Sequence, residues 1–184
     1  MNVVAKIAIL VITGSGLTFL TRRALKGFHT HGLYRLCAWI ASIALILLNL
    51  EVWFANPFDV HQVASWALLV LCVFSVLYGY GSLLKGRPDD SRNDKSLIGV
   101  ERTTVLVEVG AYRYVRHPIY SSFIFGAPGV FLKEASWAGG VLTGIIIVCT
   151  VLAAKTEETE NILYFGEAYR DYMERTKMFI PFLL

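Results

Sequence analysis

The chain has 184 residues, of which 55% are hydrophobic and 17% charged, and its formal net charge is +3. Small soluble domains usually contain about 45–50% apolar residues, so this composition favours an integral membrane protein. The modest charge, without a basic stripe interleaved with aromatic residues, argues against nucleic acid as a partner and for contact with a lipid bilayer.

Five apolar stretches separated by polar segments predict an all-α membrane fold. A helix needs about 17–25 apolar residues to cross a bilayer, and all stretches except the fourth reach that length. The first stretch runs directly into Arg22 and Arg23 without a small-residue cleavage site, so a spanning helix is favoured over a signal peptide. The sequence therefore predicts about five transmembrane helices, at residues 3–20, 36–54, 63–84, 119–132 and 137–154.

Basic residues are distributed unevenly between the two sides of this predicted bundle. Of the 17 Lys and Arg residues, all except Lys6 and Lys133 fall in three segments that alternating helices place on one side. The positive-inside rule assigns that side to the cytoplasm and the N-terminus to the outside. We therefore expect a multi-pass membrane protein with its polar C-terminal segments in the cytoplasm.

Composition divides the chain into three parts. Residues 1–84 predict a three-helix membrane scaffold that carries few reactive groups. Residues 85–102 are rich in Gly, Pro, Asp and basic residues, which is typical of a solvated cytoplasmic linker without a metal site. Residues 103–184 combine a short β-branched segment, two membrane helices and an aromatic C-terminal helix, and we expect them to form the catalytic region.

A polar cluster marks the boundary before the fourth apolar stretch. Residues 113–120 read Arg-Tyr-Val-Arg-His-Pro-Ile-Tyr, and polar groups at a membrane boundary are costly unless they are used. Near the end of the last stretch, helical spacing places Glu157, Asn161 and Phe165 on one face. Each feature alone is explained by a helix cap or a structural ion pair, but their occurrence on one predicted side favours a site.

Three sequence blocks resemble the isoprenylcysteine carboxyl methyltransferase family and the related phospholipid methyltransferases. They are Gly-Ala-Tyr-Arg-Tyr-Val-Arg-His-Pro-Ile-Tyr at 110–120, Glu-Glu at 157–158 and Phe-Gly-Glu-Ala-Tyr-Arg-Asp-Tyr at 165–172. The resemblance covers about residues 103–184. It implies S-adenosylmethionine as cofactor, bound on the cytoplasmic side without a Rossmann domain, in a pocket capped by the C-terminal helix.

The resemblance also implies roles for individual residues. Imidazole, phenol and carboxylate groups suit a cofactor that carries a carboxylate, an ammonium and ribose hydroxyls. For an acceptor that must lose a proton, the expected catalytic residues are Glu157, Glu158 and Tyr120. The expected cofactor-binding residues are Thr104, Val105, Leu106, Val107, Tyr112, His117, Pro118, Ile119, Tyr120 and Glu157.

Two positions depart from the family pattern. Thr104 stands where the family usually has a histidine, and Ala153 stands where prenylcysteine enzymes usually have a substrate-facing arginine. Lys155 does not replace that arginine, because two residues along a helix it points about 200° away. A prenylcysteine carboxylate is therefore expected to be a poor substrate.

The sequence as a whole predicts an integral membrane S-adenosylmethionine-dependent methyltransferase whose acceptor is amphiphilic and partitions into the membrane. A lipid amine or a small amphiphile as acceptor is an open alternative within the same family. A non-enzymatic membrane protein that retains the fold is another. A small transporter is disfavoured, because the chain has no internal repeat and no charges deep within the apolar stretches.

Overall fold

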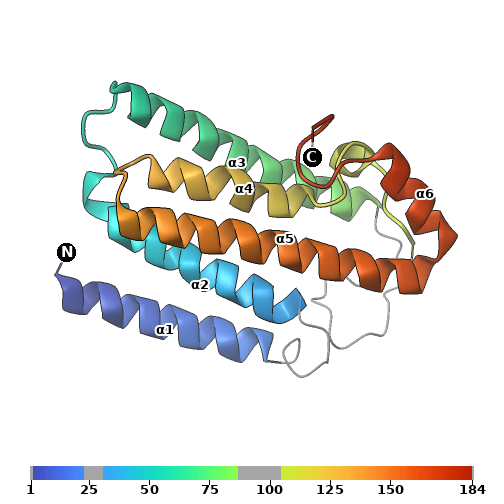
Figure 1. The fold of residues 1–184 in the computed structure, drawn as a ribbon, viewed down its shortest axis with the longest axis horizontal. Coiled ribbons are helices and arrows are strands. Elements are labelled where there is room, and N and C mark those ends of the chain that lie inside the picture. The colour runs from blue at the N-terminus through green and yellow to red at the C-terminus, as the bar shows by residue number, and fades with distance from the viewer. Residues whose placement is uncertain (1, 23–30, 87–104, 184) are drawn as a thin grey trace.

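The protein is a bundle of antiparallel helices (Figure 1). The computed structural model describes residues 2–22, 31–86 and 105–183. Within these ranges it contains no β-strand, which agrees with the predicted all-α class. The helices are α1 (Val3–Thr21), α2 (His31–Asn49), α3 (Val60–Gly86), α4 (Pro118–Phe131), α5 (Trp137–Phe165) and α6 (Glu167–Arg175), with 3-10 turns at Leu50–Val52 and Gly110–Arg113.

The helices α2 to α5 form the body of the bundle. α4 packs against α3 and α5, and α5 packs along α2. α1 lies at the edge against α2 and buries only Gly14 (Figure 1). α6 lies across one end of the bundle, next to the start of α4.

In the part of the chain that the structure describes, four helices are long and apolar enough to cross a membrane: α1, α2 with its extension to Val52, α3 and α5. They correspond to four of the five predicted stretches. α4 has 14 residues, a length of about 21 Å, which is shorter than a hydrocarbon core of about 30 Å. It still runs beside α3 and α5 from one end of the bundle toward the other (Figure 1). The fifth crossing, by α4, stays a prediction.

Proline residues influence both ends of α4. Pro118 occupies its first turn, where the missing N–H would have no helical partner. Pro128 lies within the last turn, and α3 supplies hydrogen bonds there. Ser65 donates to the carbonyl of Gly129 at 2.7 Å, and a second α3 side chain, Gln62, donates to the carbonyl of Lys133 at 3.1 Å. α3 thus satisfies carbonyls that the helix end would leave unpaired in an apolar environment.

The apolar C-terminal segment docks on the helical core. The backbone N–H of Arg116 donates to the carbonyl of Lys177 at 2.8 Å, and that of His117 to the carbonyl of Met178 at 3.1 Å. One turn into α4, the Ser121 hydroxyl donates to the next carbonyl of the segment at 2.6 Å. The end of the chain is therefore fixed beside the start of α4.

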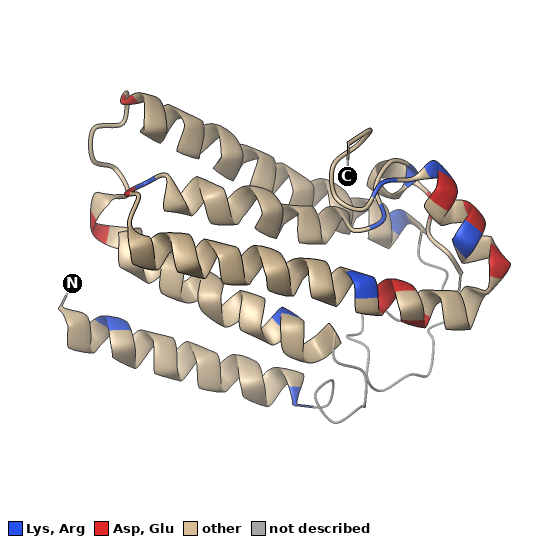
Figure 2. Cartoon of the chain, viewed as in Figure 1, with Lys and Arg blue, Asp and Glu red and all other residues tan. Residues whose placement is uncertain are grey.

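The charged residues of the described segments lie mostly near the two ends of the bundle, and the helix middles are largely without them (Figure 2). The end that carries α6 holds most of the basic residues. Lys6 lies at the other end, where it pairs with Glu51 at 3.0 Å. The structure thus brings the described basic segments to one end, as the sequence predicts. That this end faces the cytoplasm stays a prediction.

The predicted orientation is tested by labelling cysteines placed at opposite ends of the bundle. Asp59 and Asp171 are both exposed and serve as a matched pair. In a variant without the native cysteines, a membrane-impermeant maleimide should label Asp59→Cys on intact cells. It should label Asp171→Cys only after the membrane is opened. The opposite pattern would invert the topology and move the α6 end to the outside.

Candidate active site

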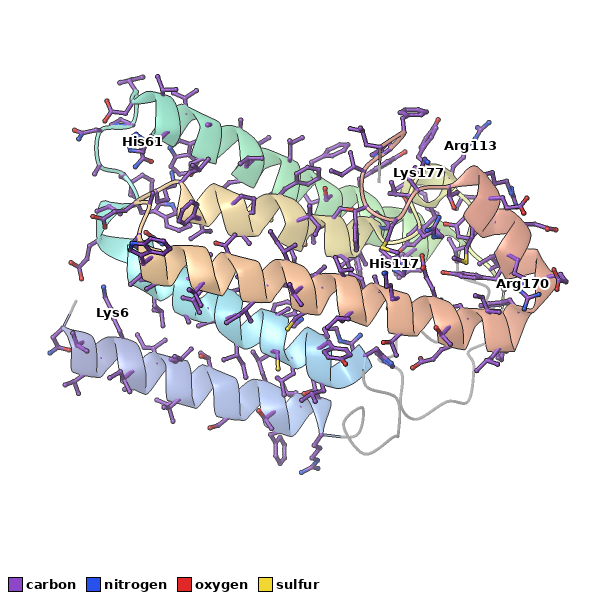
Figure 3. All side chains as sticks on the ribbon, in the orientation of Figure 1. Lys6, His61, Arg113, His117, Arg170 and Lys177 are labelled. Carbon is purple, nitrogen blue, oxygen red and sulfur yellow. The ribbon has the colours of Figure 1, made fainter. Side chains whose placement is uncertain are left out.

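A cavity opens at the end of the bundle that carries α6, where His117 lies at the start of α4 (Figure 3). It contains about 750 Å³ of empty space, part of it open to solvent. Apolar and aromatic walls with a few polar groups are typical of ligand sites. The lining residues are Leu83, Leu106, Val107, Tyr112, Arg116, His117, Ile119, Tyr120, Glu157, Asn161, Phe165, Tyr169 and Tyr172.

The segment 105–113 forms one wall, and the end of α3 fixes its path. Val107 is buried against Gly86, where any side chain would clash with it. Gly110 has a φ of +61° and lies directly on Ser82, so a side chain at Gly110 would be excluded as well. The Ser82 hydroxyl accepts a hydrogen bond from the backbone N–H that follows Gly110, at 3.0 Å. Two glycines therefore allow this segment to lie against α3.

His117, Tyr120 and Glu157 are the polar centre of the cavity. The Tyr120 hydroxyl donates to Oε2 of Glu157 at 2.9 Å, which joins α4 to α5. The His117 ring stacks on Tyr120 with centroids 5.5 Å apart and planes 19° apart. Its Nδ1 lies 4.0 Å from Oε1 of Glu157. Residues from two separate sequence blocks thus meet at one place, as the resemblance implies.

His117 is buried, yet one of its ring nitrogens is unsatisfied. Nε2 lies 3.4 Å from Oε1 of Glu158, but it forms no hydrogen bond with the described residues. An unsatisfied buried polar group costs about 1–3 kcal/mol. His117 thus lies between the cavity, which it lines, and the carboxylate of Glu158.

Glu158 does not line the cavity; it pairs with Arg116 beside it. Both side chains are almost completely buried. The Arg116 guanidinium donates from Nε to Glu158 and from Nη1 to the carbonyl of Met173 at 3.1 Å and to that of Thr176. The pair therefore ties α5 to the end of α6. The structural ion pair that the sequence left as an alternative is present, and it involves the second glutamate.

The end of α5 and α6 provide an aromatic wall. Gly166 has a φ of +63°, which lets the chain turn between the two helices. The rings of Phe165 and Tyr169 stack with centroids 6.4 Å apart, and the Tyr172 hydroxyl donates to the carbonyl of Tyr112 at 2.7 Å. Burial raises the pKa of Tyr169 and of Tyr172. Both phenols therefore stay neutral hydrogen-bond donors at physiological pH.

The cavity groups fit the cofactor that the family resemblance implies. Arg116 and His117 can donate to a carboxylate, and Glu157 can accept from an ammonium or from hydroxyl groups. Phe165 and Tyr169 offer aromatic faces to a flat ring such as adenine. Across the described ranges, no group of three or more His, Cys, Asp and Glu side chains could hold a metal ion.

The structure brings together most of the predicted cofactor residues. Val105 is 55% exposed and Pro118 is buried in the first turn of α4, so neither lines the cavity. Thr104 lies outside the described residues. The role of each residue toward a cofactor stays a prediction. The predicted residues that line the cavity are Leu106, Val107, Tyr112, His117, Ile119, Tyr120 and Glu157.

Leu83 is a cavity residue that sequence reasoning did not single out. It lies near the end of α3, in an apolar stretch that reads as scaffold. It reaches the cavity because residues 105–113 fold back onto α3, a contact that no local pattern signals. Among the described residues, Gly86 and Gly110 permit this contact, and they are the feature of the sequence that could have indicated it.

The chain is similar to known membrane methyltransferases. The pattern of the phospholipid methyltransferase family matches residues 92–168. Methanethiol S-methyltransferase of Pseudomonas deceptionensis is 28% identical over 162 residues, which cover 78% of this chain and 57% of the relative. The enzyme of the same name from Mycobacterium tuberculosis is 30% identical over 163 residues, which cover 77% of this chain and 61% of the relative.

These matches confirm the predicted resemblance to the membrane methyltransferases related to the phospholipid and isoprenylcysteine carboxyl methyltransferases. More specifically, the similar proteins are methanethiol S-methyltransferases, including one from Bradyrhizobium diazoefficiens that is 34% identical over 77 residues, 38% of this chain and 24% of the relative. The chain spans only 57% and 61% of the length of the first two. No solved structure matches it significantly.

The two neighbouring glutamates should respond differently to the same change. Glu157→Gln removes a charge from the cavity wall, so it should weaken binding of S-adenosylhomocysteine about tenfold or more. Glu158→Gln should instead lower thermal stability, because it leaves Arg116 buried without its counter-ion. Calorimetry and thermal unfolding in detergent measure the two effects. Equal effects of the two changes on binding would contradict this division of roles.

His117→Ala should weaken S-adenosylhomocysteine binding by about 1.5–3 kcal/mol, the scale of a hydrogen bond to a charged group. That corresponds to roughly a 10- to 150-fold rise in Kd, which calorimetry can resolve. His61→Ala is the matched control, because His61 lies at the opposite end of the bundle (Figure 3). Unchanged affinity in a folded His117→Ala protein would refute the assignment of this residue.

Proposed function

We propose that this chain is an integral membrane methyltransferase that transfers a methyl group from S-adenosylmethionine to a small thiol that partitions into the membrane. The observation that carries the proposal is the Tyr120–Glu157 hydrogen bond of 2.9 Å on the wall of an aromatic cavity. The names of the similar proteins support a thiol as acceptor. The positive-inside pattern supports a cavity that opens to the cytoplasm.

The surroundings of Ala153 support a small, uncharged acceptor. Ala153 is 1% exposed and lies in an apolar cluster with Tyr120. Lys155 is exposed, so it does not supply the cation that is missing at position 153. A carboxylate acceptor would therefore lack a charge-assisted partner on this side. A short thiol requires no such partner.

The proposed chemistry needs one base and an enclosed space. Bound S-adenosylmethionine would supply a methyl group on a sulfonium, whose sulfur would leave as the neutral thioether of S-adenosylhomocysteine. The thiolate is the reactive form of a thiol, so the acceptor must lose its proton. Glu157 is placed to accept this proton, with Tyr120 positioning its carboxylate, whereas Glu158 is occupied by Arg116. The apolar wall would keep water away from one side of the reactants and hold them together.

A lipid amine is the second candidate acceptor, because the matching family pattern is described as phospholipid methyltransferase. An amine also has to lose a proton, so Glu157 would serve in the same role. The two candidates differ in size and in charge. They are therefore separated by offering both acceptors to the same preparation.

Turnover by the purified protein tests the proposal directly. With S-adenosylmethionine and methanethiol, we expect dimethyl sulfide, detected by headspace gas chromatography, and a fall of at least about 100-fold with Glu157→Gln. A farnesylated cysteine analogue should give little product. If phosphatidylethanolamine in vesicles is methylated and methanethiol is not, the acceptor is a lipid amine and the proposed thiol acceptor is wrong. If S-adenosylhomocysteine binds and no acceptor is methylated, a non-enzymatic role is favoured.

A further inference from the structure

The C-terminal segment places an aromatic ring behind the polar centre of the cavity. Phe179 is 6% exposed and packs in one cluster with Tyr120, Ala153 and Ala154. Its ring centroid lies 6.2 Å from that of His117. Tyr120 belongs both to this cluster and to the cavity wall. Phe179 thus does not line the cavity itself but packs behind two residues of its wall, His117 and Tyr120.

Backbone hydrogen bonds hold this ring in position. The carbonyl of Phe179 accepts a hydrogen bond from the Ser121 hydroxyl at 2.6 Å, and the preceding carbonyl accepts one from the backbone N–H of His117 at 3.1 Å. Met178 and Ile180, on either side, pack against the same cluster. The segment is therefore anchored to α4 at consecutive residues and acts as a fixed wall.

The small residues of α5 complement the large ring opposite them. At this level α5 presents Ala153 and Ala154, which are 1% and 0% exposed, and Phe179 fills the volume that larger side chains would take. The other walls of the cavity carry the groups assigned to the cofactor. An alkyl chain that extends from an acceptor beside Glu157 and Tyr120 toward Ala153 would meet the ring of Phe179, which packs in the same cluster.

We propose that Phe179 sets the upper size limit of the methyl acceptor, a specificity role that rests on the thiol methyltransferase function proposed above. A one-carbon thiol fits beside Glu157 without displacing the ring, whereas a longer alkyl thiol meets it. In an apolar pocket, one methylene changes discrimination by about 10- to 200-fold, so a single ring can separate short from long acceptors.

The same packing changes the expectation for position 153. From the sequence alone, an arginine placed there is expected to improve turnover of a prenylcysteine substrate if the pocket has room for it. In the structure Ala153 is 1% exposed and packs in one buried cluster with Tyr120 and Phe179, so a long side chain there would have to displace its neighbours. Ala153→Arg would bury a charge among apolar groups, so we expect loss of folded protein rather than a gain of substrate.

The test compares acceptor preference in Phe179→Ala with that of the unmodified protein. We measure kcat/KM for methanethiol and for 1-butanethiol. The truncation should raise the butanethiol-to-methanethiol ratio at least tenfold, and Phe179→Leu should give a smaller rise. Leu183→Ala is the control, because Leu183 belongs to the same segment but is 74% exposed, and it should leave the ratio unchanged. General damage to the fold lowers both rates and does not move their ratio in this direction.

Each outcome decides between the two proposals. If the unmodified protein methylates methanethiol and the ratio stays within twofold in folded Phe179→Ala, the size limit is wrong and the thiol function stands. If S-adenosylhomocysteine binds but neither thiol is methylated by any variant, the thiol function fails and the size limit falls with it. If Phe179→Ala does not bind S-adenosylhomocysteine, the test rests on Phe179→Leu. The size limit then requires that Phe179→Leu raise the butanethiol-to-methanethiol ratio at least threefold, and a smaller rise would contradict it.

Discussion

The buried ion pair between Arg116 and Glu158 is the interaction on which the site depends. Arg116 precedes α4, Glu158 belongs to α5, and the same guanidinium holds carbonyls at the end of α6. Removing one member of a buried pair typically costs about 3–5 kcal/mol, because the other charge is left uncompensated. One arginine therefore keeps three elements together around the cavity. The aromatic wall on α6 has its position because of this contact.

This arrangement gives adjacent glutamates different environments. Successive residues of a helix point about 100° apart, so Glu157 reaches the cavity while Glu158 turns to Arg116. Structural and chemical roles are thus divided between two identical side chains. The backbone of the C-terminal segment binds next to the same arginine, at Arg116 and His117. The residues around Arg116 therefore both anchor α6 and hold the C-terminal segment behind the cavity.

Much of this fold could be predicted from the sequence, because membrane-spanning helices are recognisable as long apolar stretches. Helical spacing also placed Glu157, Asn161 and Phe165 on one face, and all three line the cavity. The crossing by α4 stays a prediction, because its 14 residues are fewer than a helix needs to span a bilayer. Periodicity defines which residues share a face of one helix.

Periodicity does not define which distant segments meet. Leu83 lines the cavity only because residues 105–113 fold back onto α3. Phe179 packs in one cluster with Ala153, although more than twenty residues separate them in the sequence. Val105 belongs to the predicted cofactor segment, yet it is exposed, because the segment lies on α3 with Val107 inward. These contacts depend on backbone hydrogen bonds and on glycines that permit close approach, and neither is visible as a repeating pattern.

Cross-linking of the cofactor to the unmodified protein tests the central claim most directly. Ultraviolet irradiation with labelled S-adenosylmethionine, followed by peptide mapping, identifies the residues that surround the bound molecule. We expect saturable labelling that excess S-adenosylhomocysteine abolishes, confined to peptides containing residues 106–120 or 157–172. Saturable labelling confined to α1 or α2, or no competable labelling at all, would contradict the assignment of this cavity as the cofactor site.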